Sequence, residues 1–140
     1  MNKKILIDTC YWISLYDPTD DPKQTVEAER ISTVIEDEEI IIPFPTLYEF
    51  VNSRLSRREA KIEFEQLLLR PNVIQLSDTK YKEKALDNFF IKSKYNYSDI
   101  SLVDEVLKLI MADTQIKIDY IVSFDSGLIN DALSKGLKQI

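Results

Sequence analysis

The sequence predicts an α/β fold, a three-layer α/β/α sandwich around a mainly parallel sheet of four to five strands. Short apolar runs rich in β-branched residues indicate buried strands at 5–7, 40–42, 73–76 and 120–122, with a weaker run at 137–140. Segments with an apolar stripe at helical spacing lie between these runs. Strands that alternate with helices require crossover connections, which place helices on both faces of a parallel sheet.

Four helical stripes connect the expected strands. Their apolar positions, in chain order, are Ala28, Ile31, Val34 and Ile35; Ala60, Phe64, Leu67 and Leu68; Ala85, Phe89 and Phe90; and Leu102, Val103, Val106, Leu107 and Ile110. A last helix is expected from about residue 125, with Gly136 as its left-handed C-terminal cap. No internal repeat or Pro/Gly/Ser-rich linker divides the 140 residues, so a single domain over 1–140 is expected.

The composition narrows the chemistry that this chain can perform. Its 18 Lys and Arg against 24 Asp and Glu give a net charge of −6, which argues against a protein that coats DNA. The absence of histidine excludes a Ser-His-Asp triad, a Cys-His pair and most zinc sites. A lone cysteine, Cys10, cannot form an internal disulfide, and no apolar stretch has the length of a membrane span or the form of a signal peptide. We therefore expect a cytoplasmic protein with no membrane partner.

Four acidic residues stand where the expected strands end or where helices begin. Asp8 ends the first strand, and Asp125 follows the fourth strand after two residues. Glu49 is expected in the first turn of the helix after the second strand, and Asp104 in the first turn of the clearest amphipathic helix. Because ligands of open α/β sheets sit at the carboxyl ends of the strands, we expect all four side chains at one edge of the sheet.

Carboxylates gathered at one edge need a compensating cation, because like charges raise each other's pKa. Oxygen ligands of this kind suit Mg²⁺ or Mn²⁺. Such an ion can activate water and stabilise the charge that develops on a phosphodiester, so the set predicts metal-dependent hydrolysis without histidine.

Each acid also has a purely structural interpretation. Asp8 and Asp125 are suitable helix caps, and the spacing of Thr46 to Glu49 is that of a capping box. Ser101 and Asp104 come close to the same motif, and Asp104 could instead pair with Lys108 one turn further on. The joint placement of the acids after successive strands, rather than any one of them, favours a site.

Four short motifs around these acids resemble the signatures of the PIN-domain family. They are ILIDT at 5–9, PTLYEF at 45–50, ISLVD at 100–104 and VSFD at 122–125, and they stand in the family's order with similar spacing. The resemblance covers the chain from Lys4 to about Leu137. Within the family, the sequence is most similar to VapC, the toxin of VapBC toxin–antitoxin pairs.

The resemblance implies a function and a set of roles. Asp8, Glu49, Asp104 and Asp125 would be the catalytic, metal-binding set, supported by the hydroxyls of Thr9 and Ser123. The implied activity is Mg²⁺- or Mn²⁺-dependent endonucleolytic cleavage of RNA by a homodimer, and the VapC branch implies inhibition by a cognate antitoxin. Asp99, five residues before Asp104, is either a further support for this set or a solvated turn residue.

Basic residues close behind Glu49 are candidates for gripping the RNA backbone. They are Arg54, Arg57, Arg58 and Lys61. The competing interpretation is a solvated helix face whose cations pair with Glu59, Glu63 and Glu65.

Other classes of function fit the sequence less well. The aspartate-nucleophile phosphatases need a second acid two residues after the first, where this chain has Cys10. Two glycines in the whole chain leave no glycine-rich phosphate loop. Two alternatives stay open. One is a PIN-like module that binds proteins without catalysis, and the other is a stand-alone PIN nuclease that processes RNA.

Overall fold

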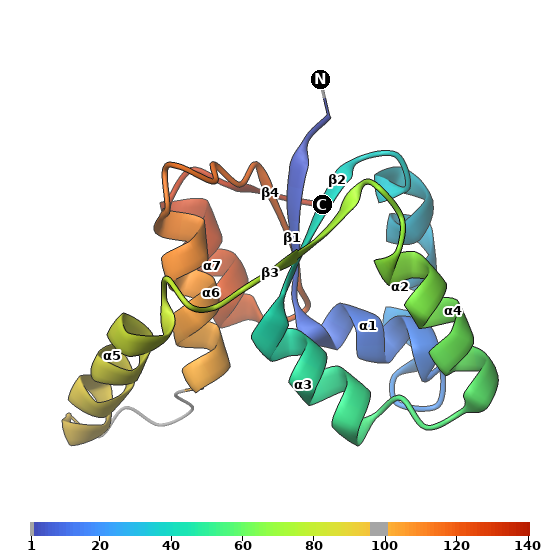
Figure 1. Ribbon diagram of the computed structural model, residues 1–140, viewed down its shortest axis with the longest axis horizontal. Helices are drawn as coiled ribbons and strands as arrows, with labels where there is room; N and C mark the ends of the chain where they lie inside the picture. The colour runs from blue at the N-terminus through green and yellow to red at the C-terminus, as the bar shows by residue number, and fades with distance from the viewer. Residues whose placement is uncertain (1, 96–100) are drawn as a thin grey trace.

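A computed structural model describes residues 2–95 and 101–140 of the chain, and its five strands form one sheet (Figure 1). The strands are β1 (Lys4–Ile7), β2 (Glu39–Pro43), β3 (Val73–Leu76), β4 (Tyr120–Val122) and β5 (Lys138–Gln139). The helices are α1 (Thr9–Tyr16), α2 (Pro22–Ile35), α3 (Phe44–Ser53), α4 (Arg58–Leu68), α5 (Lys82–Lys94), α6 (Leu102–Ala112) and α7 (Ser126–Ser134). The sheet order is β3-β2-β1-β4-β5, and every neighbouring pair is parallel. The predicted parallel sheet is thus confirmed.

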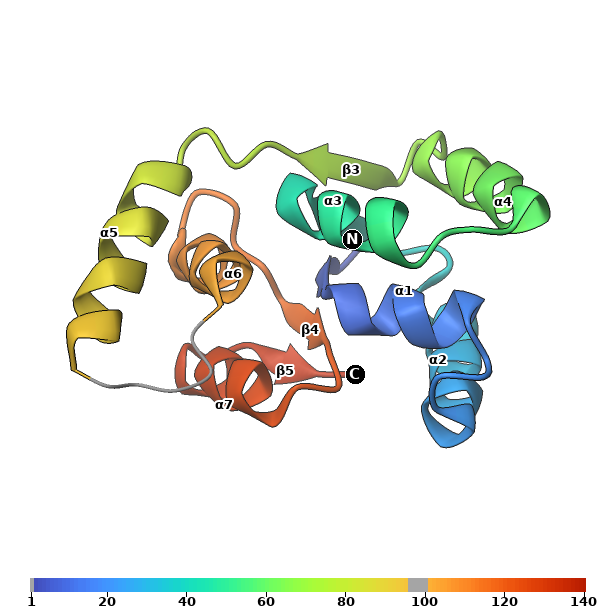
Figure 2. The ribbon, with the colours of Figure 1, turned by 90° about the horizontal axis from the view of Figure 1, so that it is seen from below.

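Strand β1 lies at the centre of the sheet, and its side chains alternate between two hydrophobic cores. Ile5 and Ile7 enter the core that α1, α2, α3 and α4 cover, whereas Leu6 enters the core built with α6, α7 and the start of α5. All three side chains are buried, as is typical of a parallel strand with both faces covered. Figures 1 and 2 show the two helical layers on opposite sides of the sheet, which confirms the three-layer sandwich.

The order of the strands creates a switch point beside β1. After β1 the chain builds β2 and β3 on one side, and later it returns to place β4 on the other side. In open α/β sheets the crevice at such a reversal, at the carboxyl ends of the strands, is where ligands bind. Asp8 follows β1 at this position, and its N–H donates to the carbonyl of Val122 at the end of β4 (3.0 Å).

The end of α7 confirms the role predicted for Gly136. This glycine has a φ of +88°, its N–H donates to the carbonyl of Leu133, and the N–H of Leu137 donates to the carbonyl of Ala132. This pair of bonds is the Schellman arrangement, which satisfies the last carbonyls of a helix. It also turns the chain directly into β5, which is shorter than the predicted run at 137–140.

Three residues of the predicted apolar stripes face solvent instead of a core. Val34 and Phe90 are each 54% exposed, and Leu102 is 40% exposed. Each is a direct neighbour of another residue assigned to the same stripe. Consecutive residues on a helix point about 100° apart, so each of these three lies at the margin of its apolar stripe, while its neighbour is more buried.

The position predicted for Glu49 in its helix was also wrong. Helix α3 begins at Phe44, directly after β2, so Glu49 lies in the second turn rather than the first. Thr46 therefore does not cap the helix, and its hydroxyl donates to the carbonyl of Pro43 (2.7 Å). The capping-box interpretation of Thr46 and Glu49 is excluded.

Among the helices of the described residues, none has both the length and the apolar character needed to cross a membrane.

Candidate active site

The carboxylate of Asp8 is buried and held on both of its oxygens. Oδ1 accepts the N–H of Thr9 (2.7 Å), so Asp8 caps α1 as the structural interpretation proposed. Oδ2 accepts the hydroxyl of Ser123 (2.8 Å) from the turn after β4. Burial raises the pKa of Asp8 above its ordinary value, and these hydrogen bonds oppose that rise. A cap alone would not require the contact from Ser123.

Cys10 belongs to the same group of side chains, and the sequence analysis did not assign it to the site. Its thiol donates a hydrogen bond to Oδ2 of Asp8 (3.3 Å), and its Sγ accepts the N–H of Phe124 (3.2 Å). Burial, followed by the charge of Asp8, raises the pKa of the thiol to about 12. The thiol is therefore protonated at neutral pH, so it is a hydrogen-bond partner rather than a nucleophile. Its place two residues after Asp8, in the first turn of α1, was the signal that could have revealed it.

Glu49 reaches the group from α3 through Thr9. The hydroxyl of Thr9 donates to Oε1 of Glu49 (2.7 Å), while the backbone N–H of Thr9 contacts Asp8. Thr9 thus links the carboxylate at the end of β1 to the carboxylate on α3. The supporting role that the family resemblance implied for Thr9 stays a prediction, and this contact is compatible with it.

Asp125 closes the group from the other side of the switch point. It caps α7, with Oδ1 accepting the N–H groups of Gly127 (2.8 Å) and Leu128 (3.3 Å). Its own N–H donates to the hydroxyl of Ser123 (3.0 Å), the same hydroxyl that donates to Asp8. Ser123 therefore fixes the backbone of one acid and the side chain of another.

Asp104 completes the group from the first turn of α6, where the N-cap Ser101 accepts its backbone N–H (3.2 Å). The pKa of Asp104 is raised to about 6, chiefly by burial and then by the charges of Asp8 and Asp125, with a smaller contribution from Glu49. Asp104 thus lies within electrostatic reach of the other three predicted acids. Lys108 lowers the pKa of Asp104, but its ion pair is with Glu105 (3.4 Å).

The four acids fit a hard divalent cation by their chemistry, although their side chains are not drawn together around one. In residues 2–95 and 101–140, no group of three or more Cys, Asp or Glu side chains forms a ready metal site. The donors are carboxylate oxygens, which are the ligands that Mg²⁺ and Mn²⁺ prefer. Burial raises the pKa of Asp104 most, and the negative charges of the other three acids add to the rise, as expected where no cation compensates them.

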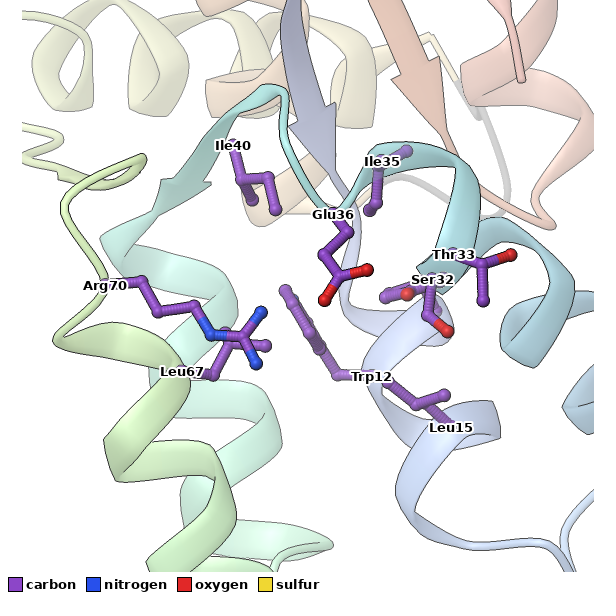
Figure 3. A pocket seen from close by; sticks show the side chains of 10 residues that line it. Trp12, Leu15, Ser32, Thr33, Ile35, Glu36, Ile40, Leu67 and Arg70 are labelled. Atoms are coloured by element: carbon purple, nitrogen blue, oxygen red, sulfur yellow. The ribbon is translucent and has the colours of Figure 1, made fainter.

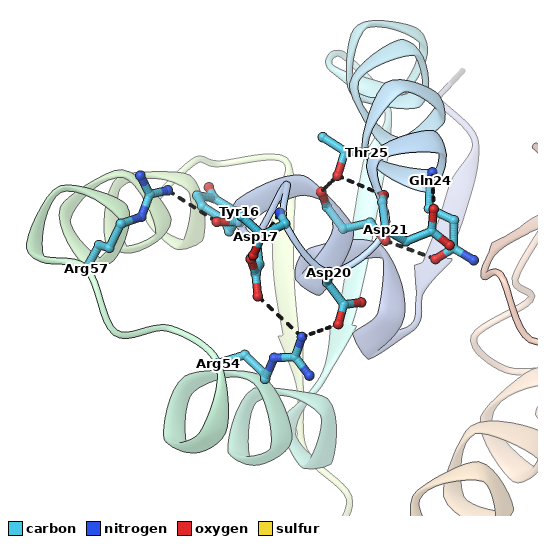
Figure 4. A network of polar contacts seen from close by, with 10 residues as sticks. Tyr16, Asp17, Asp20, Asp21, Gln24, Thr25, Arg54 and Arg57 are labelled. Atoms are coloured by element: carbon cyan, nitrogen blue, oxygen red, sulfur yellow. Dashed lines mark hydrogen bonds and ion pairs between the residues drawn. The ribbon is translucent and has the colours of Figure 1, made fainter.

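Two of the predicted RNA-binding residues, Arg54 and Arg57, make their contacts outside this group, and Asp99 lies outside the described residues. Arg54 contacts Asp20 (2.6 Å) and Asp17 (3.3 Å), and Arg57 donates to the carbonyl of Tyr16 (3.2 Å), so both hold the α1–α2 connection (Figure 4). These partners of Arg54 are not the glutamates of α4 that the competing interpretation named. Contact of this basic group with RNA stays a prediction.

A cavity of about 280 Å³ lies within the layer of α1, α2 and α4. Figure 3 shows Trp12 between Leu67 and Arg70 on one side and Ile35 and Glu36 on the other. None of the four acids lines this cavity, so it is distinct from the group at the switch point.

A family model for the PIN domain matches residues 5–132. The chain belongs to the PIN domain family. The match runs from β1 into α7 and includes all four acids, in agreement with the motif resemblance. No curated protein sequence matches this PIN domain.

The fold of this PIN domain is also that of a solved toxin. It is similar to the crystal structure of Mycobacterium tuberculosis VapC20, described as a toxin that cleaves the sarcin-ricin loop, with a TM-score of 0.67. The match covers 89% of this chain and 92% of that chain at 20% sequence identity, a level at which the likeness concerns the fold.

Proposed function

We propose that this PIN-domain protein is an endoribonuclease that depends on a divalent metal ion, Mg²⁺ or Mn²⁺. The observation that carries the proposal is the grouping of Asp8, Glu49, Asp104 and Asp125 at the switch point, where burial, and then the charges of the other three acids, raise the pKa of Asp104 to about 6. These four acids would hold the ion. When bound, the ion supplies a Lewis acid that stabilises the charge developing on a phosphodiester.

The remaining residues of the group would position the acids. Thr9 holds Glu49, and Ser123 holds Asp8 while it fixes the backbone of Asp125. Because both oxygens of Asp8 already accept hydrogen bonds, its carboxylate is fixed before any ligand arrives. Asp99 is proposed as a further support of the same set.

The proposal extends to the biological setting that the VapC-like motifs suggest. We propose that the protein is the cytoplasmic toxin of a VapBC-type pair, inhibited by a cognate antitoxin. Self-association is supported by an exposed apolar stripe on α3, formed by Phe44, Tyr48 and Val51. Analytical ultracentrifugation tests the homodimer, and relief of growth arrest by the protein encoded by the adjacent gene tests the antitoxin.

The activity is tested by incubating the full chain with a panel of RNAs, which includes single-stranded oligonucleotides and a sarcin-ricin loop hairpin. We expect cleavage with Mg²⁺ or Mn²⁺, none in EDTA, and none for Asp8→Asn or Asp104→Asn. Asp37→Asn removes one carboxylate outside the proposed set and serves as the matched control, with cleavage unchanged.

Cleavage that persists in EDTA, or in both active-site variants, contradicts the proposal. Lack of turnover on every RNA, together with partner binding that survives both substitutions, would instead favour the PIN-like protein-interaction module. Cleavage by a chain that neither arrests growth nor responds to an antitoxin would favour a stand-alone nuclease of RNA processing.

A further inference from the structure

Helix α5 differs in charge from the rest of this acidic chain. It carries Lys82, Lys84, Lys92 and Lys94 against Glu83 and Asp87, a net charge of +4 − 2 = +2. None of the other six helices of the described residues is positive, since α1 and α2 are neutral and the other four each carry −1. With a net charge of −6 for the whole chain, α5 is a localised basic surface on an acidic protein.

This helix lies against the turn of α6 that carries Asp104. Near its beginning, Lys82 lines a cavity of about 110 Å³ together with Leu102 and Val103 of α6. Near its end, Lys92 forms an ion pair with Glu105. Figure 1 shows α5 descending to the edge of the molecule where α6 begins. The basic helix therefore packs against α6, the helix that carries Asp104.

The lysines of α5 have two different tasks. Lys92 is bound to Glu105, which is 3% exposed and also contacts Lys108, so it serves the packing of α5 on α6. Lys82, Lys84 and Lys94 are exposed and present their charge to solvent. Tyr95, at the end of the helix, is 73% exposed and offers an aromatic face in the same region.

The acid group alone would repel a polyanion, so an RNA substrate needs a nearby cationic surface. Arg54 is already balanced by two carboxylates, whereas the exposed lysines of α5 lie on a helix that packs against α6, which carries Asp104. We propose that α5 binds the phosphate backbone of RNA and leads the strand to the acid group, with Tyr95 stacking on an unpaired base. This inference rests on the proposed ribonuclease function, and it names the surface by which that site receives its substrate.

The test compares two triple variants of the full chain that each remove three positive charges. The first is Lys82→Gln/Lys84→Gln/Lys94→Gln on α5, which leaves the ion pair of Lys92 intact. The matched control is Lys3→Gln/Lys23→Gln/Lys138→Gln, at three exposed lysines on other elements. Both are made in an Asp8→Asn background, so that the probe, a fluorescent single-stranded RNA of mixed sequence, is bound without being cut.

Fluorescence anisotropy at about 50 mM and about 200 mM salt is expected to show at least tenfold weaker binding for the α5 variant, with a shallower salt dependence. The control is expected to stay within about twofold of the parent. Equal binding by the α5 variant and its parent, an equal loss in the control, or no binding by the parent overturns the inference. A loss confined to the control variant overturns it as well.

Cleavage by the chain with Asp8 intact separates this inference from the proposed function. If that chain cleaves RNA and the α5 variant binds and cleaves equally well, the result contradicts the RNA-binding surface on α5 and supports the ribonuclease function. If the chain cleaves no RNA but its binding of RNA depends on α5, the result contradicts the ribonuclease function and supports the RNA-binding surface on α5.

Discussion

The hydroxyl of Ser123 donates a hydrogen bond of 2.8 Å to Oδ2 of Asp8, joining the ends of two strands that are 115 residues apart in sequence. Ser123 also accepts the N–H of Asp125. Cys10 makes a second link of the same form, since its thiol donates to Asp8 and accepts the N–H of Phe124. Two hydrogen-bonded paths therefore connect the buried carboxylate of Asp8, directly after β1, to the turn that carries Asp125.

Replacing Ser123 by alanine breaks the shorter of these two paths. Asp8 loses a charge-assisted hydrogen bond, and the N–H of Asp125 loses its acceptor. We expect RNA cleavage to fall by about 10- to 100-fold, as for other groups that orient metal ligands. Single-turnover cleavage across a Mg²⁺ titration measures the effect, and Ser123→Thr, which retains the hydroxyl, should recover much of the activity. Wild-type cleavage by Ser123→Ala would show that the contact is structural only.

Cys10 can be tested by exchanging its sulfur for oxygen. Cys10→Ser retains a donor for Asp8 and an acceptor for Phe124, whereas Cys10→Ala removes both. We therefore expect Cys10→Ser to cleave at near the parental rate, and Cys10→Ala to be roughly 3- to 10-fold slower. Because burial raises the pKa of this thiol to about 12, Ellman's reagent should label it slowly at pH 8 in the folded protein and rapidly after unfolding. Rapid labelling of the folded chain would contradict the burial.

The parts of this fold that sequence predicted are those that depend on local pattern. The positions of the four main strands follow from apolar runs, and β1, β2 and β4 are mostly buried as expected. The prediction that β3 is buried was wrong, because this strand lies at the edge of the sheet and exposes Ile74 and Gln75. Helix α3 begins five residues before Glu49 because β2 passes directly into it, with Pro45 in its first turn. The spacing of Thr46 and Glu49 resembles a capping box, which placed Glu49 in the first turn of the helix instead of the second.

The parts that sequence could not predict depend on contacts between distant segments. Neither the pairing of Arg54 with Asp17 and Asp20 nor that of Lys92 with Glu105 has a local signal, because each joins two separate elements. The absence of histidine excludes a Cys-His pair, but this exclusion concerns Cys10 only as a nucleophile and not as a hydrogen-bond partner. A hydrogen-bond role for the thiol depends on the return of β4 beside β1, which only the folded chain displays.

Asp104 should lower the stability of the metal-free protein at neutral pH. Its pKa is about 6 in the folded protein against an ordinary value of 3.8, so folding favours the protonated form. The folded state therefore loses stability as pH rises from about 4 to about 6, and the loss is complete above that range. Asp104→Asn carries no charge to lose, so it should be more stable than the parent by roughly 1 to 3 kcal/mol at pH 8 and equal to it at pH 3.5.

Thermal unfolding in EDTA across this pH range measures the difference. The same variant should not cleave RNA. Asp104 would then be a residue that lowers the stability of the folded protein but is required for RNA cleavage. Added Mg²⁺ should raise the melting temperature of the parent at pH 8 and leave that of Asp104→Asn nearly unchanged. A destabilised Asp104→Asn at pH 8 would contradict the electrostatic origin of the raised pKa.

The buried glutamate beside Asp104 gives a prediction about stability alone. Glu105 is 3% exposed and is balanced by Lys92 and Lys108, so Lys92→Met leaves a buried carboxylate with a single cation 3.4 Å away. We expect Lys92→Met to lower the free energy of unfolding by about 1 to 2 kcal/mol, between the values for exposed and fully buried pairs. Lys84→Met, at an exposed lysine of the same helix, should change it by less than about 0.5 kcal/mol.

The cause of that loss can be separated from lost packing by a double substitution. If the stranded charge of Glu105 is responsible, Lys92→Met/Glu105→Gln should be more stable than Lys92→Met alone, because glutamine leaves no charge to compensate. If the packing of the Lys92 stem is responsible, the second substitution should add its own cost instead. Urea unfolding of the parent, Lys92→Met, Glu105→Gln and the double variant distinguishes the two explanations. If the two substitutions change the free energy of unfolding additively, the ion pair does not stabilise the packing of α5 on α6.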